Sequence, residues 1–321
     1  MNGFFLHLSI ADWVNGVLET FVTQYGDSFH HISALMLRYL LVPLEGALRA
    51  TPPWLMLLAV GAIAWNATRR ASLGALFMLL LYAIGCFGLW DKLMQTLALM
   101  LVATVLSVAL GVPAGILASR SPWLRRMLLP VLDVMQTLPS FVYLIPVLML
   151  FGLGKVPAIL ATIIYALPPL IRLTDLGIRQ VDADVTEAAR AFGTTRWQLL
   201  VNVQLPLARP SIMAGINQTT MMALSMVVIA SMIGSRGLGE DVLAGIQTMD
   251  VGKGTQAGVA IVILAIVIDR ISQGFGQERR ARRRLAQQRR QKGASRVPYR
   301  LPRRPAAPGA DTNPPTESSR A

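Results

Sequence analysis

Long apolar stretches alternate with short polar ones along most of the chain. A helix needs about 20 mostly apolar residues to cross roughly 30 Å of hydrocarbon. The windows that meet or approach this length are residues 50–68, 71–90, 93–119, 127–151, 156–171, 210–235 and 254–268. They contain no Asp, Glu, Lys or Arg apart from Asp133. The pattern therefore predicts an all-α, polytopic integral membrane protein with about seven transmembrane helices.

The distribution of charge orients these spans. Charged residues make up 15% of the 321 residues, against roughly 25% in soluble domains. The formal net charge is +13, but residues 272–321 alone carry +10, so the rest of the chain is nearly neutral. With the N-terminus outside, the cytoplasmic turns and tail hold 24 Lys and Arg residues and the opposite side holds six. Because Lys and Arg concentrate in cytoplasmic loops, we predict an extracytoplasmic N-terminus and a cytoplasmic C-terminus.

The remaining segments differ from the spans in composition. Residues 1–49 lack the basic start of a signal peptide and repeat Phe4, Leu8 and Trp13 at helical spacing. We expect an extracytoplasmic amphipathic segment on the membrane surface, or a helix packed against the bundle. Residues 50–91 would be two peripheral transmembrane helices, and residues 92–271 a five-helix core. Residues 272–321, rich in Arg, Pro and Gln, predict a disordered basic tail that contacts anionic lipid or simply anchors the last span.

One polar stretch, residues 179–209, is too long for a simple turn, and we call it the finger. Val185 and Phe192 place an apolar side on a short helix, and Gly193 suits the left-handed conformation that ends one. A second helix is expected over residues 195–203, ending before Leu205-Pro206 because the residue before a proline disfavours the helical conformation. A helix–glycine–helix element at the membrane face predicts a docking site for a partner.

The finger carries a motif with defined spacing. Its members are Glu187-Ala188-Ala189, Gly193 after three residues, Val203 after nine more, and Leu205-Pro206 after one. This pattern resembles the EAA loop of bacterial binding-protein-dependent ABC importer permeases, with Val203 where the family has Ile. Over residues 93–271, stretches such as LDVMQTLPSFVYLIPVLMLFGLG and IMAGINQTTMMALSMVVIASMIG look like the glycine betaine/proline betaine branch, which is close to the choline permeases.

The resemblance implies a fold, a function and partners. The fold is that of an ABC importer permease with a cytoplasmic EAA coupling loop, in the inner (cytoplasmic) membrane of a bacterium. The function is alternating-access import of quaternary ammonium solutes such as glycine betaine, proline betaine or choline. The partners are cytoplasmic ABC ATPase subunits, a periplasmic or lipid-anchored substrate-binding protein, and a second permease copy. The residues implied to couple to the ATPase are Glu187, Ala188, Ala189, Gly193, Leu205 and Pro206.

The chain shows no pattern for catalysis of its own. It has no G-x-x-x-x-G-K-[ST] motif for nucleotide phosphates, and its three histidines all lie within the first 31 residues. We expect a permease subunit that is not an enzyme and that binds no metal or cofactor, with ATP and Mg²⁺ held by the partner ATPase. Only Tyr299 interleaves the arginines of the tail, so nucleic-acid binding is not expected.

Polar residues inside the apolar windows are candidates for the translocation path. Either they line that path, or they join neighbouring helices by hydrogen bonds worth about 0.6 kcal/mol each. The candidates are Gln136, Pro139, Asn217, Gln218, Thr219, Thr220 and Ser225. Asp133 is expected near the cytoplasmic interface, paired or hydrated, because an isolated charge inside a membrane is costly.

Two other classes of protein account for parts of the pattern. An ion-coupled secondary transporter or channel would act without an ATPase, but it requires several intramembrane ionisable residues and an internal repeat, and neither is evident. A membrane-tethered nucleic-acid binder rests on the basic tail alone. The importer permease is the interpretation that also accounts for the finger.

Overall fold

The structure is a computed structural model that describes residues 10–294, and these form helices and turns without a strand. The chain divides into two units, Met1–Arg280 and Ala281–Ala321. Within the described range, five helices are long and apolar enough to cross a membrane, or six if one bent pair counts as a span. The predicted all-α class is confirmed, whereas the predicted number of seven spans is not.

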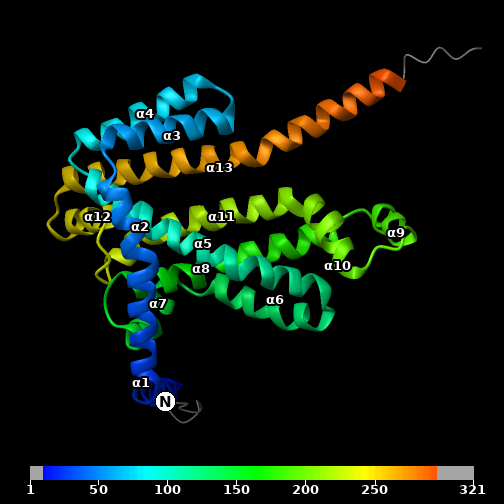
Figure 1. Ribbon diagram of the computed structural model, residues 1–321. Helices are drawn as coiled ribbons and strands as arrows, with labels where there is room; N and C mark the ends of the chain where they lie inside the picture. Colours follow the sequence, from blue (N-terminus) through cyan, green and yellow to red (C-terminus); the bar gives the residue numbers. More distant parts are fainter. Residues whose placement is uncertain (1–9, 295–321) are drawn as a thin grey trace, which may run out of the picture. The chain divides into compact units, whose positions relative to one another are not determined.

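Three long helices form the centre of the first unit (Figure 1). They are α5 (Trp90–Arg120), α8 (Lys155–Arg179) and α11 (Leu205–Ser231), and α8 packs along both of the others. A Cβ added at Gly115 of α5 would lie 2.5 Å from Cβ of Thr174 on α8. Small residues at such crossings let membrane helices approach closely, which strengthens their packing in a solvent that is itself apolar.

Two shorter helices, α6 (Pro122–Thr137) and α7 (Ser140–Phe151), form a bent pair with 100° between them. Pro139 lies at the break, where its missing N–H and its ring stop the first helix from continuing. Asp133 of α6 forms an ion pair with Arg172 of α8, so the predicted pairing of this acid is confirmed.

A helical hairpin, α3 (Pro53–Thr68) and α4 (Ala71–Cys86), precedes the core. Each helix has 16 residues and is therefore about 24 Å long, less than the roughly 30 Å of a hydrocarbon core. The two helices cross closely where Gly74 meets the carbonyl of Gly61. Arg69, at a φ of 58°, ends α3 and limits its length. Two of the seven predicted spans are shortened in this way.

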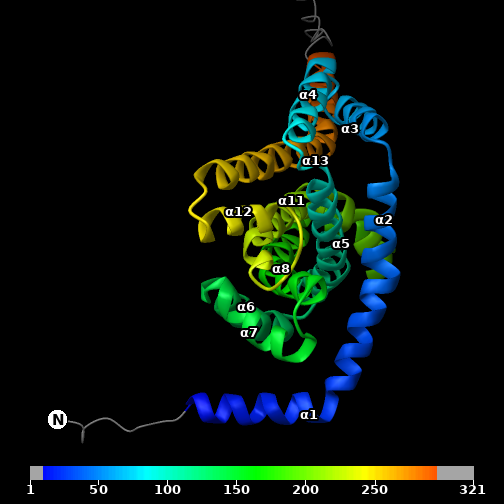
Figure 2. The same ribbon diagram turned by 90° about the vertical axis from the view of Figure 1, so that its left-hand side faces the viewer.

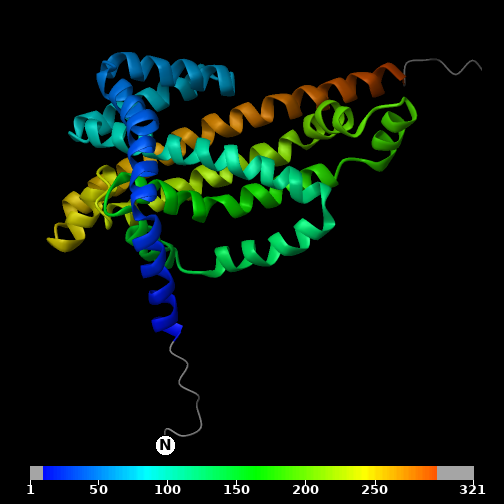
Figure 3. The ribbon, with the colours of Figure 1, turned by 60° about the horizontal axis from the view of Figure 1, so that its bottom comes forward.

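The N-terminal elements α1 (Ile10–Met36), the π-helical η1 (Leu37–Leu41) and α2 (Val42–Ala50) follow one another without a break. Figures 1 and 3 show this helix crossing the direction of the central bundle, and Figure 2 shows α2 passing beside α5. The predicted placement of residues 1–49 on the membrane surface stays a prediction. By length and apolar composition, however, Leu18–Ala50 counts among the candidate spans.

The last two helices are α12 (Leu238–Gln247) and α13 (Val251–Ala294). α13 includes the candidate span Val251–Gly274 and continues past residue 272, where the sequence predicted disorder. Residues 277–292 contain no proline or glycine and are rich in Arg, Gln and Ala, which extend a helix that is already nucleated. The remainder of the predicted tail, residues 295–321, lies outside the described range.

Candidate functional site

The finger lies at one end of the bundle, and α12 lies at the other (Figure 1). Its first helix is α9 (Ala183–Ala191), which starts where the carboxylate of Asp182 accepts a hydrogen bond of 3.0 Å from the backbone N–H of Asp184. Only Gln180, Val181 and Asp182 separate α9 from the end of α8 at Arg179. The connection is this short, so α9 stays close to the end of a core helix.

A tight turn separates α9 from the next helix. Gly193 has a φ of 78°, and its N–H donates to the carbonyl of Arg190 at 2.9 Å. The predicted left-handed glycine is therefore confirmed. Thr194 follows and donates from both its N–H and its hydroxyl to the carbonyl of Ala189, at 3.3 and 2.8 Å. Thr195 then forms a capping box with Gln198, which starts α10 (Arg196–Gln198).

The surface of the finger is apolar at its tip and open to solvent. The side chains of Phe192 and Trp197 are 90% and 70% exposed. Glu187 and Ala188 are also exposed, and Ala189 is half-buried. Exposed apolar side chains grouped on one element outside the spans mark interaction surfaces, so this surface fits a protein contact.

The second helix of the finger does not end where the sequence predicted. α10 leads through the π-helical segment η2 (Leu199–Gln204) into α11, so that residues Arg196–Ser231 run as one helix. The N–H of Leu205 bonds to the carbonyl of Leu200 at the end of the π-helical turn. Pro206 comes next, in the first turn of α11, where its missing N–H and fixed φ are tolerated.

The base of the finger is tied to the bundle. Buried Leu200 packs with Ile178 of α8 and Ala208 of α11, and half-buried Leu205 joins this cluster. A guanidinium nitrogen of Arg120, the last residue of α5, donates to the carbonyl of Arg196 at 2.9 Å. All three central helices therefore contact the base of the finger.

The polar candidates on α11 do not form one cluster. Consecutive helical residues point about 100° apart, so they separate onto different neighbours. Asn217 donates to Asp269 of α13 at 3.0 Å, and buried Thr219 donates to the carbonyl of Ala166 on α8 at 3.0 Å. Thr220 and Ser225 bond to carbonyls of α11 itself, those of Ile216 and Met221. Asn217 and Thr219 thus form hydrogen bonds between helices, which is the second of the two alternatives that the sequence left open.

A smaller set of the candidates remains accessible. Gln218 and Ser225 are exposed and lie seven residues apart, on one face of α11. Gln136 and Pro139 are exposed where α6 meets α7. These four residues are the candidates that a solute could reach from outside the chain.

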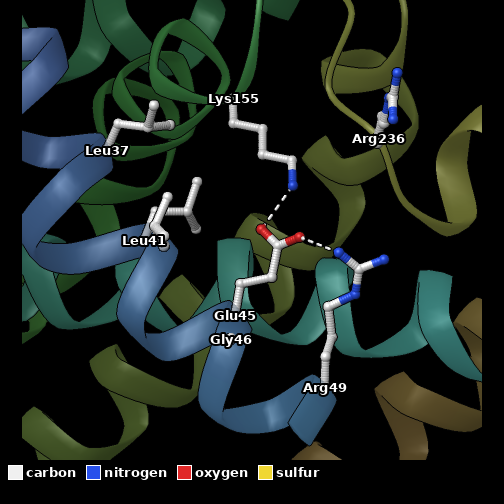
Figure 4. A pocket seen from close by; sticks show the side chains of 8 residues that line it. Leu37, Leu41, Glu45, Gly46, Arg49, Lys155 and Arg236 are labelled. Atoms are coloured by element: carbon white, nitrogen blue, oxygen red, sulfur yellow. Dashed lines mark hydrogen bonds and ion pairs between the residues drawn. The ribbon is translucent and has the colours of Figure 1, made fainter.

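A charged cluster that the sequence did not predict lies away from the finger. Glu45 of α2 is 8% exposed, and its carboxylate receives Lys155 at the start of α8 at 2.6 Å and Arg49 at 3.3 Å (Figure 4). Arg49 also forms an ion pair with Asp91 at the start of α5. Glu45 is the one charged residue within the apolar stretch 39–48, and this was the signal in the sequence that could have pointed to the cluster. Among the described residues, no three His, Cys, Asp or Glu side chains gather closely enough to hold a metal ion.

Known proteins resemble this chain over most of its length. Residues 107–280 match the family described as "Binding-protein-dependent transport system inner membrane component". The glycine betaine/proline betaine transport system permease protein ProW of Escherichia coli (strain K12) is 46% identical over 86% of this chain and 77% of its own length. The glycine betaine transport system permease protein OpuAB of Bacillus subtilis (strain 168) is 43% identical over 86% of this chain and 97% of its own.

Two further proteins extend the comparison. The glycine betaine/carnitine transport permease protein GbuB of Listeria monocytogenes serotype 1/2a (strain 10403S) is 40% identical over 84% of this chain and 96% of its own. A solved structure of the MetNI methionine ABC transporter, in an inward-facing conformation, matches with a TM-score of 0.53 and 21% identity over 57% of this chain and 92% of that chain. At this level of identity, the match establishes a shared fold.

Proposed function

The chain belongs to the binding-protein-dependent transport system inner membrane components, and from that premise we propose that it is the permease subunit of an ATP-driven importer for quaternary ammonium solutes. The observation that carries the proposal is the finger, which presents exposed Phe192 and Trp197 at one end of a bundle of membrane helices. This chain moves the solute, and hydrolysis of ATP belongs to a separate subunit that holds ATP and Mg²⁺.

The ATPase binds the finger in this proposal. Exposed Glu187 and the small side chains of Ala188 and Ala189 let α9 fit closely against a groove, and Gly193 sets the angle of the helix that follows. ATP binding shifts the permease between two states because the docked finger is contacted differently in each. Leu205 and Pro206 join the finger to α11, so they carry its movement into the core.

The names of the relatives indicate the solute. ProW is named for glycine betaine and proline betaine, OpuAB for glycine betaine, and GbuB for glycine betaine and carnitine. All are zwitterions with a quaternary ammonium group. We assign quaternary ammonium solutes to this chain, with choline, a cation that lacks the carboxylate, as a further solute to test.

The translocation path lies between two copies of the chain in this proposal. Gln218 and Ser225 give α11 a polar exposed face, and the bend at Pro139 places Gln136 at the surface as well. A polar face is costly against lipid, and a second copy that faces it across a solute path removes that cost. The proposed assembly is a permease homodimer with two ATPase subunits.

The proposed topology places the finger in the cytoplasm and α12 outside. The arginines near the finger and in the tail follow the charge rule for cytoplasmic segments. Each basic residue of the tail that is held near the anionic cytoplasmic leaflet contributes about 1 kcal/mol to the free energy of membrane binding.

Purification of the chain from native membranes in a mild detergent tests the proposal. We expect a P-loop ATPase to accompany it in stoichiometric amount, and the complex in liposomes to import glycine betaine only with ATP and a binding protein. Competition by proline betaine, carnitine and choline ranks the solutes. Recovery of the chain without an ATPase, together with uptake that an ion gradient drives, would establish the secondary transporter instead.

A further inference from the structure

A pocket of about 430 Å³ lies at the junction of the N-terminal helix with α8 and the loop after α11 (Figure 4). Leu37, Leu41 and Val42 form its apolar wall. Its charged lining consists of Glu45, Arg49, Lys155 and Arg236. A concave site with an apolar wall and a few charged groups is the usual form of a binding site in proteins.

The charges in this pocket do not balance. Glu45 is paired with Lys155, and Asp91 outside the lining pairs with Arg49, so two acids match two of the three bases. Arg236 forms no ion pair with any residue in the described range, and Figure 4 shows its guanidinium directed away from Glu45. The pocket therefore carries one excess positive charge that is available to an anionic group from outside the chain.

The backbone that carries Arg236 is well anchored. The N–H of Gly154 donates to the carbonyl of Ile233 at 3.0 Å, before the arginine. After it, the N–H of Leu238 donates to the hydroxyl of Thr96 on α5 at 2.9 Å. The side chain itself is exposed. A free guanidinium on an anchored loop is prepared for binding, because little backbone entropy is lost when a ligand arrives.

We propose that Arg236 receives an acidic side chain of the substrate-binding protein when that protein docks. The inference rests on the proposed function, which requires such a partner on the side opposite the finger. The planar guanidinium matches a carboxylate in a two-bond geometry, and an accessible loop suits a protein surface better than a lipid.

The position of the pocket gives docking a route to the finger. Lys155 is the first residue of α8, and the last residue of that helix is three residues from α9. α8 has 25 residues and is therefore about 37 Å long. A contact that changes the balance around Glu45 and Lys155 displaces one end of this helix, and the finger is attached to its other end.

The test uses the full complex with its ATPase in nanodiscs. ATP hydrolysis is measured against the concentration of the liganded binding protein. We expect Arg236→Ala to raise the half-saturating concentration at least threefold and Arg236→Glu at least tenfold. Arg236→Lys keeps the charge but loses the two-bond geometry, so its value should lie between those of wild type and Arg236→Ala. Hydrolysis without binding protein stays unchanged. The wild-type half-saturating concentration also rises more steeply with salt than that of Arg236→Ala, since a charge pair has been lost.

Arg38→Glu is the matched control, because Arg38 is an exposed arginine of η1 outside the pocket lining. An unchanged half-saturating concentration in Arg236→Glu would overturn the inference, as would an equal rise in Arg38→Glu. The inference would also be overturned if the permease alone bound the solute and Arg236→Ala abolished that binding while docking stayed normal. That result would make the pocket a solute site. A wild-type complex that no binding protein stimulates would refute the proposed function, and this inference with it.

Discussion

Gly193 is the position where the finger depends most directly on the backbone of one residue. Its φ of 78° is a conformation that side chains with a Cβ avoid, and a Cβ added there would meet no atom within 4 Å. Substitution therefore costs backbone energy alone, about 1–2 kcal/mol for an ordinary residue. Asparagine adopts this region more readily than alanine, and a β-branched side chain does so least readily. We expect loss of function in the order Gly193→Asn, Gly193→Ala, Gly193→Val.

The size of the effect follows from the population of the native turn. A cost of about 1–2 kcal/mol lowers the ratio of the native turn to its alternatives by a factor of roughly 5 to 30. Where those alternatives dominate, the affinity for the ATPase falls in proportion. The assay is binding of purified ATPase to the permease in nanodiscs, followed by ATP-driven uptake. The melting temperature of the bundle should not change, because the turn lies outside the packed core.

Gly258→Ala is the control for this series. Gly258 lies in α13, and a Cβ added there also meets nothing within 4 Å, but its φ is not in the left-handed range. Binding of the ATPase should match wild type in this variant. Gly193→Val with wild-type affinity would refute the reasoning, as would a Gly193 series that lowers the melting temperature of the bundle without weakening docking.

Three further predictions follow from the packing. Lys155→Met leaves buried Glu45 with Arg49 as its remaining partner, so we expect the folded state to lose about 2–3 kcal/mol of stability. Adding Glu45→Gln to the same chain should restore part of this loss. A double-mutant cycle in detergent measures the coupling between the two residues, and strictly additive losses would contradict the prediction. Gly115→Leu inserts a side chain where even a Cβ is 2.5 Å from that of Thr174, and a loss of about 1–3 kcal/mol should appear as a lower melting temperature. Phe192→Ala removes a side chain that is 90% exposed, so the affinity for the ATPase should fall while the melting temperature stays constant. An unchanged affinity would show that Phe192 is not part of the interface.

Local features of the sequence predicted the helical class and the shape of the finger's turn. Gly193 has the predicted left-handed backbone because its conformation depends on its own lack of a Cβ and on bonds within the turn between residues three to five positions apart. The resemblance to importer permeases is confirmed by the family match over residues 107–280. The roles of Glu187, Ala188 and Ala189 at an ATPase remain predictions.

Neighbouring elements decided the outcome where a local rule was incomplete or left two alternatives open. Pro206 was expected to end a helix, but the π-helical turn before it lets the chain continue into α11. For Asn217 and Thr219 the sequence left two alternatives open, a place on the path or a bond between helices, and helices packed on two sides of α11 accept their hydrogen bonds. In each case the deciding partner is a turn or a helix that residue type alone does not specify.

The sequence by itself determined that this chain is a helical membrane protein of the importer permease family, because apolar length, charge bias and motif spacing are properties of contiguous residues. Only the tertiary structure decided which charges meet. Lys155 pairs with Glu45 across 110 positions, and Lys92 pairs with Asp241 across 149, at 2.6 Å in both cases. The same packing leaves Arg236 without an acid among the described residues. Ion pairs of this kind depend on how helices cross, and no local pattern encodes that crossing.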